Sequence, residues 1–224
     1  MKTSRQFYTE LEAEELAKRK KKIHTKKELS YLKKLLRKEQ KILDLACGYG
    51  RFTIPLAKLG YRIEGIDITP ALIKKAKEEA DKSKLKIKFK IGDMRKLPYK
   101  DNSFNVIICM LSAFQELTKK SDQLKSIKEM LRILKKEGFT LIDLPKLEKT
   151  TKDIVDVKRG DSFKKSKRGN ITYAVISGIE AMHLYRYDKK TLTDLMKKTN
   201  ARKFKVFIDK FGGRDRLFLQ FWKW

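Results

Sequence analysis

Two glycines and two aspartates in the first half of the chain are spaced as such residues are in sites that bind a nucleoside. Gly48 and Gly50 lack a Cβ, so the backbone there can take positive φ values and let a ligand lie against the peptide groups. Asp67 follows the glycines by about 17 to 20 residues, the separation at which a carboxylate on a second strand meets ribose hydroxyls. Asp93 adds a further carboxylate beside the apolar Met94. Together these residues predict nucleoside binding.

Each of these residues comes at the end of a segment that we expect to be a buried parallel strand. The apolar run 42–45 precedes the glycines, a strand expected at 62–68 contains Asp67, and a strand expected at 85–91 leads into Asp93. The carboxyl ends of parallel strands share one edge of a sheet, where ligands bind in open α/β folds. A helix expected at 51–59 would point the unpaired N–H groups of its first turn at the same place and favour an anion such as a carboxylate.

The chain continues this alternation of strands and helices. Thr69 and Pro70 supply an N-cap and a first helical residue for a helix that runs to about Ser83. Beyond it we expect a strand at 104–111, a helix at 121–136 ended by Gly138, and a strand at 139–144. Such alternation predicts an α/β fold with right-handed crossovers around a parallel sheet.

Three motifs carry a resemblance to a known family. They are Leu-Asp-Leu-Ala-Cys-Gly-Tyr-Gly at 43–50, Gly-Ile-Asp-Ile-Thr at 65–69, and Gly-Asp-Met-Arg-Lys-Leu-Pro at 92–98, the last followed by Ser-Phe-Asn-Val-Ile at 103–107. In order and spacing they resemble the motifs of class I S-adenosylmethionine-dependent methyltransferases, most of all stand-alone bacterial and archaeal ones. A dinucleotide dehydrogenase fits less well, because its fingerprint wants a third small residue where this chain has Thr53.

The resemblance implies a Rossmann-like, seven-stranded, mostly parallel sheet with a reversed terminal hairpin. We expect one domain over residues 1–224, since this length suits a single sizeable core. Its parts would be a helical N-terminal cover at 1–40, a cofactor-binding half at 41–145, a β-rich insertion after strand 5 at 146–187, and a last helix with the hairpin at 188–224. Thr9 and Glu12 in the cover have capping-box spacing, and Asp188 is expected to cap the last helix.

The resemblance also implies roles on the cofactor side. Asp67 would accept hydrogen bonds from the ribose hydroxyls, while Asp93 would bind the adenine amino group with Met94 against its face. The Gly48 and Gly50 loop would hold the methionyl portion of S-adenosylmethionine. The full set of cofactor-binding residues expected in this way is Asp44, Ala46, Gly48, Gly50, Asp67, Ile68, Asp93, Met94 and Met110. Methyl transfer of the SN2 type needs alignment and proximity, with no covalent intermediate.

Candidates on the acceptor side are fewer. Glu116 comes just past the fourth strand, and His183 and Tyr185 share one face of a strand in the insertion. Any of the three could orient or deprotonate a hydroxyl or an amine. In the resembling family the insertion after the fifth strand shapes the acceptor pocket. We expect a small-molecule or peptide acceptor, methylated on oxygen or nitrogen.

An RNA methyltransferase is the main alternative, because the formal net charge is +28 and aromatic residues stand beside basic ones. Against it, Cys109-Met-Leu-Ser-Ala113 at the end of the fourth strand is neither an Asn/Asp-Pro-Pro-aromatic loop nor a Pro-Cys motif. Lysine is also spread along nearly every helix, which favours a solvated surface. An alternative from another class is a cofactor-binding regulatory protein without catalysis.

Composition narrows the remaining classes of protein. Cys47 and Cys109 both lie in segments expected to be buried, and the chain has two histidines, so a disulfide framework or a zinc site is not expected. No apolar run approaches the length of a membrane span, and the N-terminus is polar and charged. We therefore expect a cytoplasmic protein without a metal or a membrane partner, and the sequence leaves its oligomeric state open.

Overall fold

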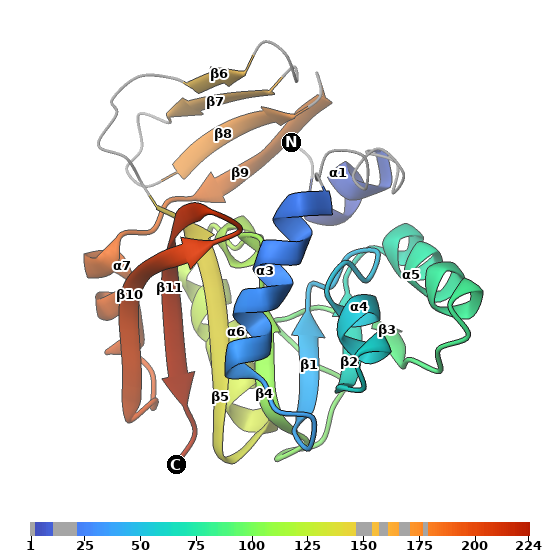
Figure 1. Ribbon diagram of the computed structural model, residues 1–224. Coiled ribbons are helices and arrows are strands. Elements are labelled where there is room, and N and C mark those ends of the chain that lie inside the picture. The colour runs from blue at the N-terminus through green and yellow to red at the C-terminus, as the bar shows by residue number, and fades with distance from the viewer. Residues whose placement is uncertain (1–2, 11–21, 147–153, 157–160, 166–170, 177–178) are drawn as a thin grey trace.

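The computed structural model describes residues 3–10, 22–146, 154–156, 161–165, 171–176 and 179–224. Its centre is a seven-stranded sheet with the order β10-β11-β5-β4-β1-β2-β3 (Figure 1). These strands are β1 Lys41–Leu45, β2 Arg62–Asp67, β3 Phe89–Ile91, β4 Phe104–Cys109, β5 Leu134–Pro145, β10 Lys203–Phe211 and β11 Arg214–Trp222. Strands β1 to β5 run parallel, and β11 is antiparallel to both of its neighbours. The expected Rossmann-like sheet with a reversed terminal hairpin is confirmed.

Helices cover both faces of this sheet, because its central strands are apolar on both sides. On one face Leu32 of α3 packs with Ile42, and on the other Met130 of α6 packs with Leu43. The adjacent residues Ile42 and Leu43 thus belong to opposite layers of the core, as the period of a strand requires. The helices that flank the sheet are α3 Lys22–Leu35, α4 Thr53–Lys58, α5 Pro70–Lys82, α6 Lys120–Ile133 and α7 Lys189–Met196. Asp188 caps α7 as predicted, accepting the Thr191 N–H at 2.7 Å.

The fifth strand begins earlier than the sequence predicts. β5 starts at Leu134, directly after α6, whereas the pattern predicts a helix to 136 and a strand from 139. Leu134 is fully buried and pairs with Phe104 at the start of β4, and the register shifts before Val106. Burial of Leu134 in the sheet therefore ends the helix ahead of Gly138.

The N-terminal helix α1, Ser4–Glu10, also differs from expectation. The predicted capping box at Thr9 is wrong, because Thr9 lies inside the helix and its hydroxyl donates to the Arg5 carbonyl at 2.7 Å. Thr3 and Gln6 form the cap instead. The Thr3 N–H donates to Gln6 Oε1 at 2.9 Å, and the Gln6 N–H donates to Thr3 Oγ1 at 3.3 Å.

A four-stranded antiparallel sheet lies on the side toward which β1 points (Figure 1). Its strands are β6 Ile154–Asp156, β7 Asp161–Lys165, β8 Ile171–Ile176 and β9 Ile179–Tyr185. The β-rich character expected for 146–187 is therefore present in the described residues of that segment. Within the described segments, no helix has the length and apolar character needed to cross a membrane.

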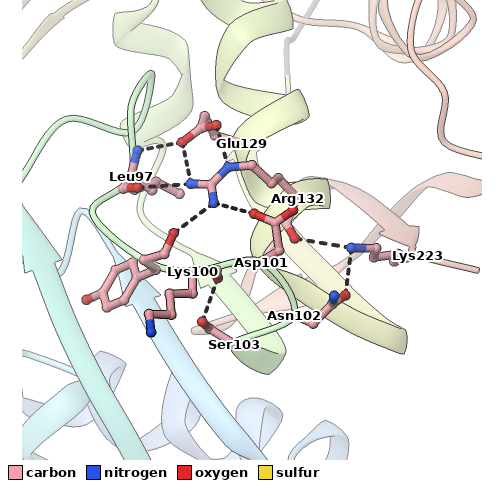
Figure 2. Close-up of polar contacts among 9 residues, drawn as sticks. Leu97, Lys100, Asp101, Asn102, Ser103, Glu129, Arg132 and Lys223 are labelled. Carbon is pink, nitrogen blue, oxygen red and sulfur yellow. Dashed lines mark hydrogen bonds and ion pairs between the residues drawn. The ribbon is translucent and has the colours of Figure 1, made fainter.

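The connection from β3 to β4 is held against α6 by Arg132 (Figure 2). Its guanidinium donates to the carbonyls of Tyr99 at 2.7 Å and Leu97 at 3.0 Å. Glu129, one turn earlier on α6, accepts the Leu97 N–H at 2.7 Å. β3 itself is shorter than the predicted 85–91, because it is the outer strand and pairs only with β2. The segment that follows β3 is thus positioned largely by side chains of α6.

Candidate active site

A cavity of about 870 Å³ lies at the carboxyl ends of β1, β2 and β4, with further walls from α1 and β9. Pockets for small ligands and cofactors are typically about 300–1,000 Å³. Of the expected cofactor residues, those that line it are Asp44, Ala46, Gly48, Asp67, Ile68, Asp93, Met94 and Met110. Of the acceptor-side candidates, Glu116 and His183 line it too, whereas Gly50 and Tyr185 are not among its walls. Most of the expected site is thereby brought together.

The two glycines of the loop after β1 have different surroundings. Both take positive φ, +56° at Gly48 and +82° at Gly50. A Cβ on Gly48 would meet only Leu72 at 4.0 Å, so the space beside this residue is open to a ligand. A Cβ on Gly50 would lie 2.9 Å from Ile54, so this glycine is required by packing under α4. Close approach of a ligand to the backbone is therefore possible at Gly48.

Asp67 joins the glycine loop to the start of α5. Its carboxylate accepts the Gly48 N–H at 2.9 Å and the Thr69 N–H at 2.8 Å. Burial raises the pKa of this carboxyl, and the two backbone N–H groups counteract part of the rise. Each carboxylate oxygen keeps a second lone pair, so ribose hydroxyls can still donate to it. Thr69 occupies the N-cap position with Pro70 after it as predicted, but its side chain makes no capping bond.

Asp44 lies deeper, with 2% of its surface exposed. Its Oδ2 accepts a hydrogen bond from Thr53 Oγ1 at 2.6 Å. Burial raises the pKa of the Asp44 carboxyl to about 7; Thr53 lowers it in part, and the nearby charge of Asp67 adds to the rise. Among the described residues, no lysine or arginine forms an ion pair with Asp44 or Asp67. This part of the wall therefore suits a positively charged ligand.

Asp93 is bound by an arginine that the sequence reasoning did not single out. Arg95 Nε lies 3.0 Å from both carboxylate oxygens of Asp93, and Nη1 reaches Asp122 at 3.1 Å. Burial alone would raise the pKa of Asp93, but the hydrogen bonds and charge of Arg95 bring it below its usual value. The spacing of Asp93 and Arg95 in the sequence could have indicated this contact, because an arginine two residues after an aspartate can fold back onto its carboxylate. Arg95 thus fixes the orientation of the Asp93 carboxylate.

The wall that contains the expected acceptor-side candidates combines three elements distant in sequence. Tyr8 of α1 donates its hydroxyl to Glu116 Oε1 at 2.9 Å, and Glu116 ends the 3-10 helix Ala113–Glu116 that follows β4. His183 of β9 lines the same cavity. Tyr185 instead packs its ring 4.7 Å from that of Tyr187, next to the core. The sequence around Tyr8 gives no local sign of this contact with Glu116.

No cluster of three or more His, Cys, Asp or Glu side chains arranged to hold a metal ion is found in the part of the chain that the structure describes. The cysteines Cys47 and Cys109 are both buried and unpaired by disulfide. Burial raises the pKa of each thiol well above its usual value, which disfavours the reactive thiolate.

Comparison with known proteins decides the family. The sequence model of a family described as methyltransferase domain matches residues 36–200, which is most of the chain. The chain belongs to this family. Its motifs and sheet are those of a class I S-adenosylmethionine-dependent methyltransferase domain.

The similarity of this methyltransferase domain to individual proteins is partial. Putative methyltransferase YqeM of Bacillus subtilis is 34% identical over 104 residues, which are 46% of this chain and 42% of the relative. Ubiquinone biosynthesis O-methyltransferase of Pelagibacter ubique is 36% identical over 119 residues, 53% of this chain and 46% of the relative. The chain thus spans less than half the length of these relatives.

A solved structure covers far more of the methyltransferase domain. An S-adenosylmethionine-dependent methyltransferase from Clostridium acetobutylicum superposes with a TM-score of 0.68, covering 89% of this chain and 92% of that one. Its sequence identity of 15% makes this a likeness of fold alone.

The residues present fit S-adenosylmethionine, the methyl donor of this family. Asp44 and Asp67 are two buried carboxylates beside the open space at Gly48, as a cationic nucleoside requires. Arg51 also lines the cavity, is 8% exposed, and ion-pairs with Glu28, while its Nη1 has no hydrogen-bond partner among the residues that the structure describes. A buried guanidinium N–H without a partner favours a nearby carboxylate, such as that of the methionyl group.

Proposed function

We propose that this methyltransferase domain moves a methyl group from S-adenosylmethionine to an oxygen or nitrogen atom of a small-molecule or peptide acceptor. The observation that carries the proposal is one continuous cavity with two kinds of wall. Gly48 and Asp67 supply the wall on the β1 and β2 side, whereas Tyr8, Glu116 and His183 supply the wall beyond β4. A volume of about 870 Å³ suits a nucleoside cofactor together with a small acceptor.

On the cofactor side, each proposed role rests on a contact or a burial described above. Asp67, held by the Gly48 and Thr69 N–H groups, would accept hydrogen bonds from the ribose hydroxyls. Asp93, oriented by Arg95, would accept a hydrogen bond from the adenine amino group, with Met94 beside the ring. Asp44 would balance the positive charge of the ligand. When bound, S-adenosylmethionine supplies a methyl group made electrophilic by its sulfonium.

The residues of the chain then contribute orientation and a proton acceptor. Alignment of donor and acceptor supplies most of the rate enhancement in a reaction of this type. The Glu116 carboxylate, oriented by the Tyr8 hydroxyl, can take the proton that the acceptor's hydroxyl or ammonium must lose. The buried Phe7 and Met110 exclude water from the cavity walls.

Two features support a small acceptor. A relative with 36% identity over about half of this chain is named ubiquinone biosynthesis O-methyltransferase, and that name indicates that the relative acts on a small molecule. The exposed lysines Lys33, Lys77 and Lys125 lie on three helices, α3, α5 and α6, so the positive charge is not confined to one groove. Together they favour a small molecule over RNA.

The test is a transfer screen with methyl-labelled S-adenosylmethionine and cell extract separated into RNA, protein and small-molecule fractions. We expect label in the small-molecule or peptide fraction, and less transfer by the Asp67→Ala variant when the cofactor concentration is limiting. Label in RNA would replace the proposal by the nucleic-acid alternative. Binding of the cofactor without transfer to any fraction would favour a regulatory protein.

A further inference from the structure

Leu111 and Ser112, which follow β4 after the single residue Met110, both adopt left-handed backbone conformations, with φ of +58° and +71°. Non-glycine residues seldom take such values, and a bulky residue such as leucine does so least of all. Strained backbone of this kind persists only where the surrounding structure over-determines it, and it concentrates at functional sites. Both residues line the cavity, so the strained turn is part of its wall.

A buried carboxylate and an arginine hold this turn. Asp143 of β5 is fully buried; its Oδ1 accepts the Leu111 N–H, and its backbone carbonyl accepts the Ser112 N–H at 3.2 Å. Arg216 of β11 donates from Nε to Asp143 Oδ2 at 2.8 Å and from Nη2 to Ser112 Oγ. The guanidinium therefore binds the turn both directly and through Asp143.

The turn also fixes what precedes and follows it. Met110 comes directly before the turn, is 3% exposed and lines the cavity. It follows β4, which pairs with β1, the strand that leads into the glycine loop. The 3-10 helix that carries Glu116 begins at Ala113, directly after it. A change of backbone conformation at Leu111 and Ser112 would move both walls.

We propose that Arg216 is a positioning residue, which holds the left-handed turn at Leu111 and Ser112 and thereby sets where Met110 and Glu116 stand in the cavity. The roles of Met110 toward the cofactor and of Glu116 toward the acceptor rest on the proposed function. The position of the turn itself does not. Arg216 belongs to the terminal hairpin and pairs through its backbone with Pro145 of the cavity lining. Among the contacts of the described residues, its side chain reaches the lining at Ser112.

The first experiment observes the turn without any ligand. Methionine is labelled with ¹³C at the methyl group, and the Met110 resonance is assigned with Met110→Leu. Arg216→Leu should shift that resonance, and Leu111→Gly in addition should restore it, because glycine adopts positive φ without a clamp. Arg214→Leu, an exposed change on the same strand, is the matched control and should leave it unmoved.

Two results would overturn the proposal: an unmoved Met110 resonance in Arg216→Leu, or an equal shift with and without Leu111→Gly. If Arg216→Leu does not fold, Arg216→Lys serves instead. Lysine keeps the positive charge beside Asp143 but lacks the guanidinium group, whose several N–H donors reach both Asp143 and Ser112. The same resonance and the same rescue by Leu111→Gly then decide.

Cofactor affinity gives a second measurement. Calorimetry with S-adenosylhomocysteine should show binding weakened about tenfold by Arg216→Leu and largely recovered by Leu111→Gly. Equal weakening in both backgrounds would assign Arg216 a general stabilising role and contradict the proposal. Absence of binding by the unmodified protein would contradict the proposed function, and the methionine resonance would still decide the role of Arg216.

Discussion

The hydroxyl of Tyr8 lies 2.9 Å from a carboxylate oxygen of Glu116, across a sequence separation of 108 residues. This bond ties α1 to the segment after β4 in the wall of the cavity, where the neighbouring Phe7 is fully buried. The N-terminal helix is thus part of the site and not only a cover of the sheet.

Tyr8→Phe should loosen α1 from the cavity while leaving the rest of the fold intact. Removing one part-buried hydrogen bond to a charged group costs about 1.5–3 kcal/mol locally. Backbone amides of α1 should therefore exchange with deuterium faster than in the unmodified protein. Tyr61→Phe, in which no hydrogen bond described here is lost, is the control; equal protection of α1 in all three proteins would contradict the prediction.

Asp67→Ala should weaken binding of S-adenosylhomocysteine by about 1–3 kcal/mol, because it removes the acceptor for two ribose hydroxyls and frees the Gly48 N–H. Isothermal calorimetry measures the change. Asp81→Ala, on the exposed side of α5, is the matched control and should bind as the unmodified protein does. Unchanged affinity in Asp67→Ala would place the nucleoside elsewhere.

Asp44 predicts a pH dependence of stability. Its pKa is about 7 in the folded protein and near 3.8 in the unfolded chain, so between these values the folded state holds a proton that the unfolded chain has released. The free energy of unfolding should therefore fall as the pH rises across this window and level off above it. Urea unfolding at pH 5 and pH 7.5 measures the slope.

Asp44→Asn should reduce that fall, since asparagine does not titrate. Part of the fall should remain, because burial also raises the pKa values of Asp67 and Asp143. Asp81→Asn should keep the full slope. An identical slope in Asp44→Asn and the unmodified protein would show that Asp44 is ionised throughout the window.

Arg132→Met should lower the free energy of unfolding by about 1–3 kcal/mol, because the Tyr99 carbonyl loses the arginine donor and the Leu97 carbonyl keeps only the Tyr99 N–H (Figure 2). The side chain of Arg132 is 30% exposed, so the value should lie toward the lower end. Lys128→Met, an exposed change on the same helix, should alter stability by less than about 0.5 kcal/mol. Equal losses in the two variants would show that the contacts of Arg132 contribute little.

The basic residues of the insertion should have little part in transfer to a small acceptor. Neutralising Lys164, Lys165, Lys167 and Arg168 together should leave turnover of the true acceptor and affinity for the cofactor nearly unchanged. A matched set outside the insertion is Lys74, Lys77, Lys82 and Lys84, all exposed and in or just after α5. Loss of turnover from the insertion set alone, at equal stability, would make RNA or another polyanion the leading acceptor.

The sequence predicts that the residues expected on the cofactor side lie close together, because the segments that carry them are local and regular. One short segment encodes β1 and the loop with Gly48, and another encodes β2 with Asp67. Parallel pairing of β1 with β2 then brings the carboxyl ends of the two strands together. The shape of the reversed hairpin follows from Gly212 and Gly213, which both take positive φ between β10 and β11. Such signals can be seen without knowing any contact through space.

The rest depends on contacts between distant segments. Nothing near Ser112 signals that Arg216 will reach it, nor does Tyr8 carry a sign of its bond to Glu116. The early start of β5 has the same origin, since Leu134 has helical neighbours in sequence and becomes a strand residue only by pairing with β4. Acceptor-side geometry in this fold is therefore set by tertiary structure.

The place of β11 has a consequence for the order in which the protein can assemble. β11 comes after every other strand in the sequence but lies between β5 and β10 in the sheet. Until it is synthesised and inserted, β5 has an open edge and Asp143 lacks its arginine. A nascent chain that ends before residue 214 would therefore carry an unpaired strand edge prone to association, beside a buried carboxylate without a counterion. Support of the turn at Leu111 and Ser112 and protection of the β5 edge against aggregation thus both depend on the late insertion of β11.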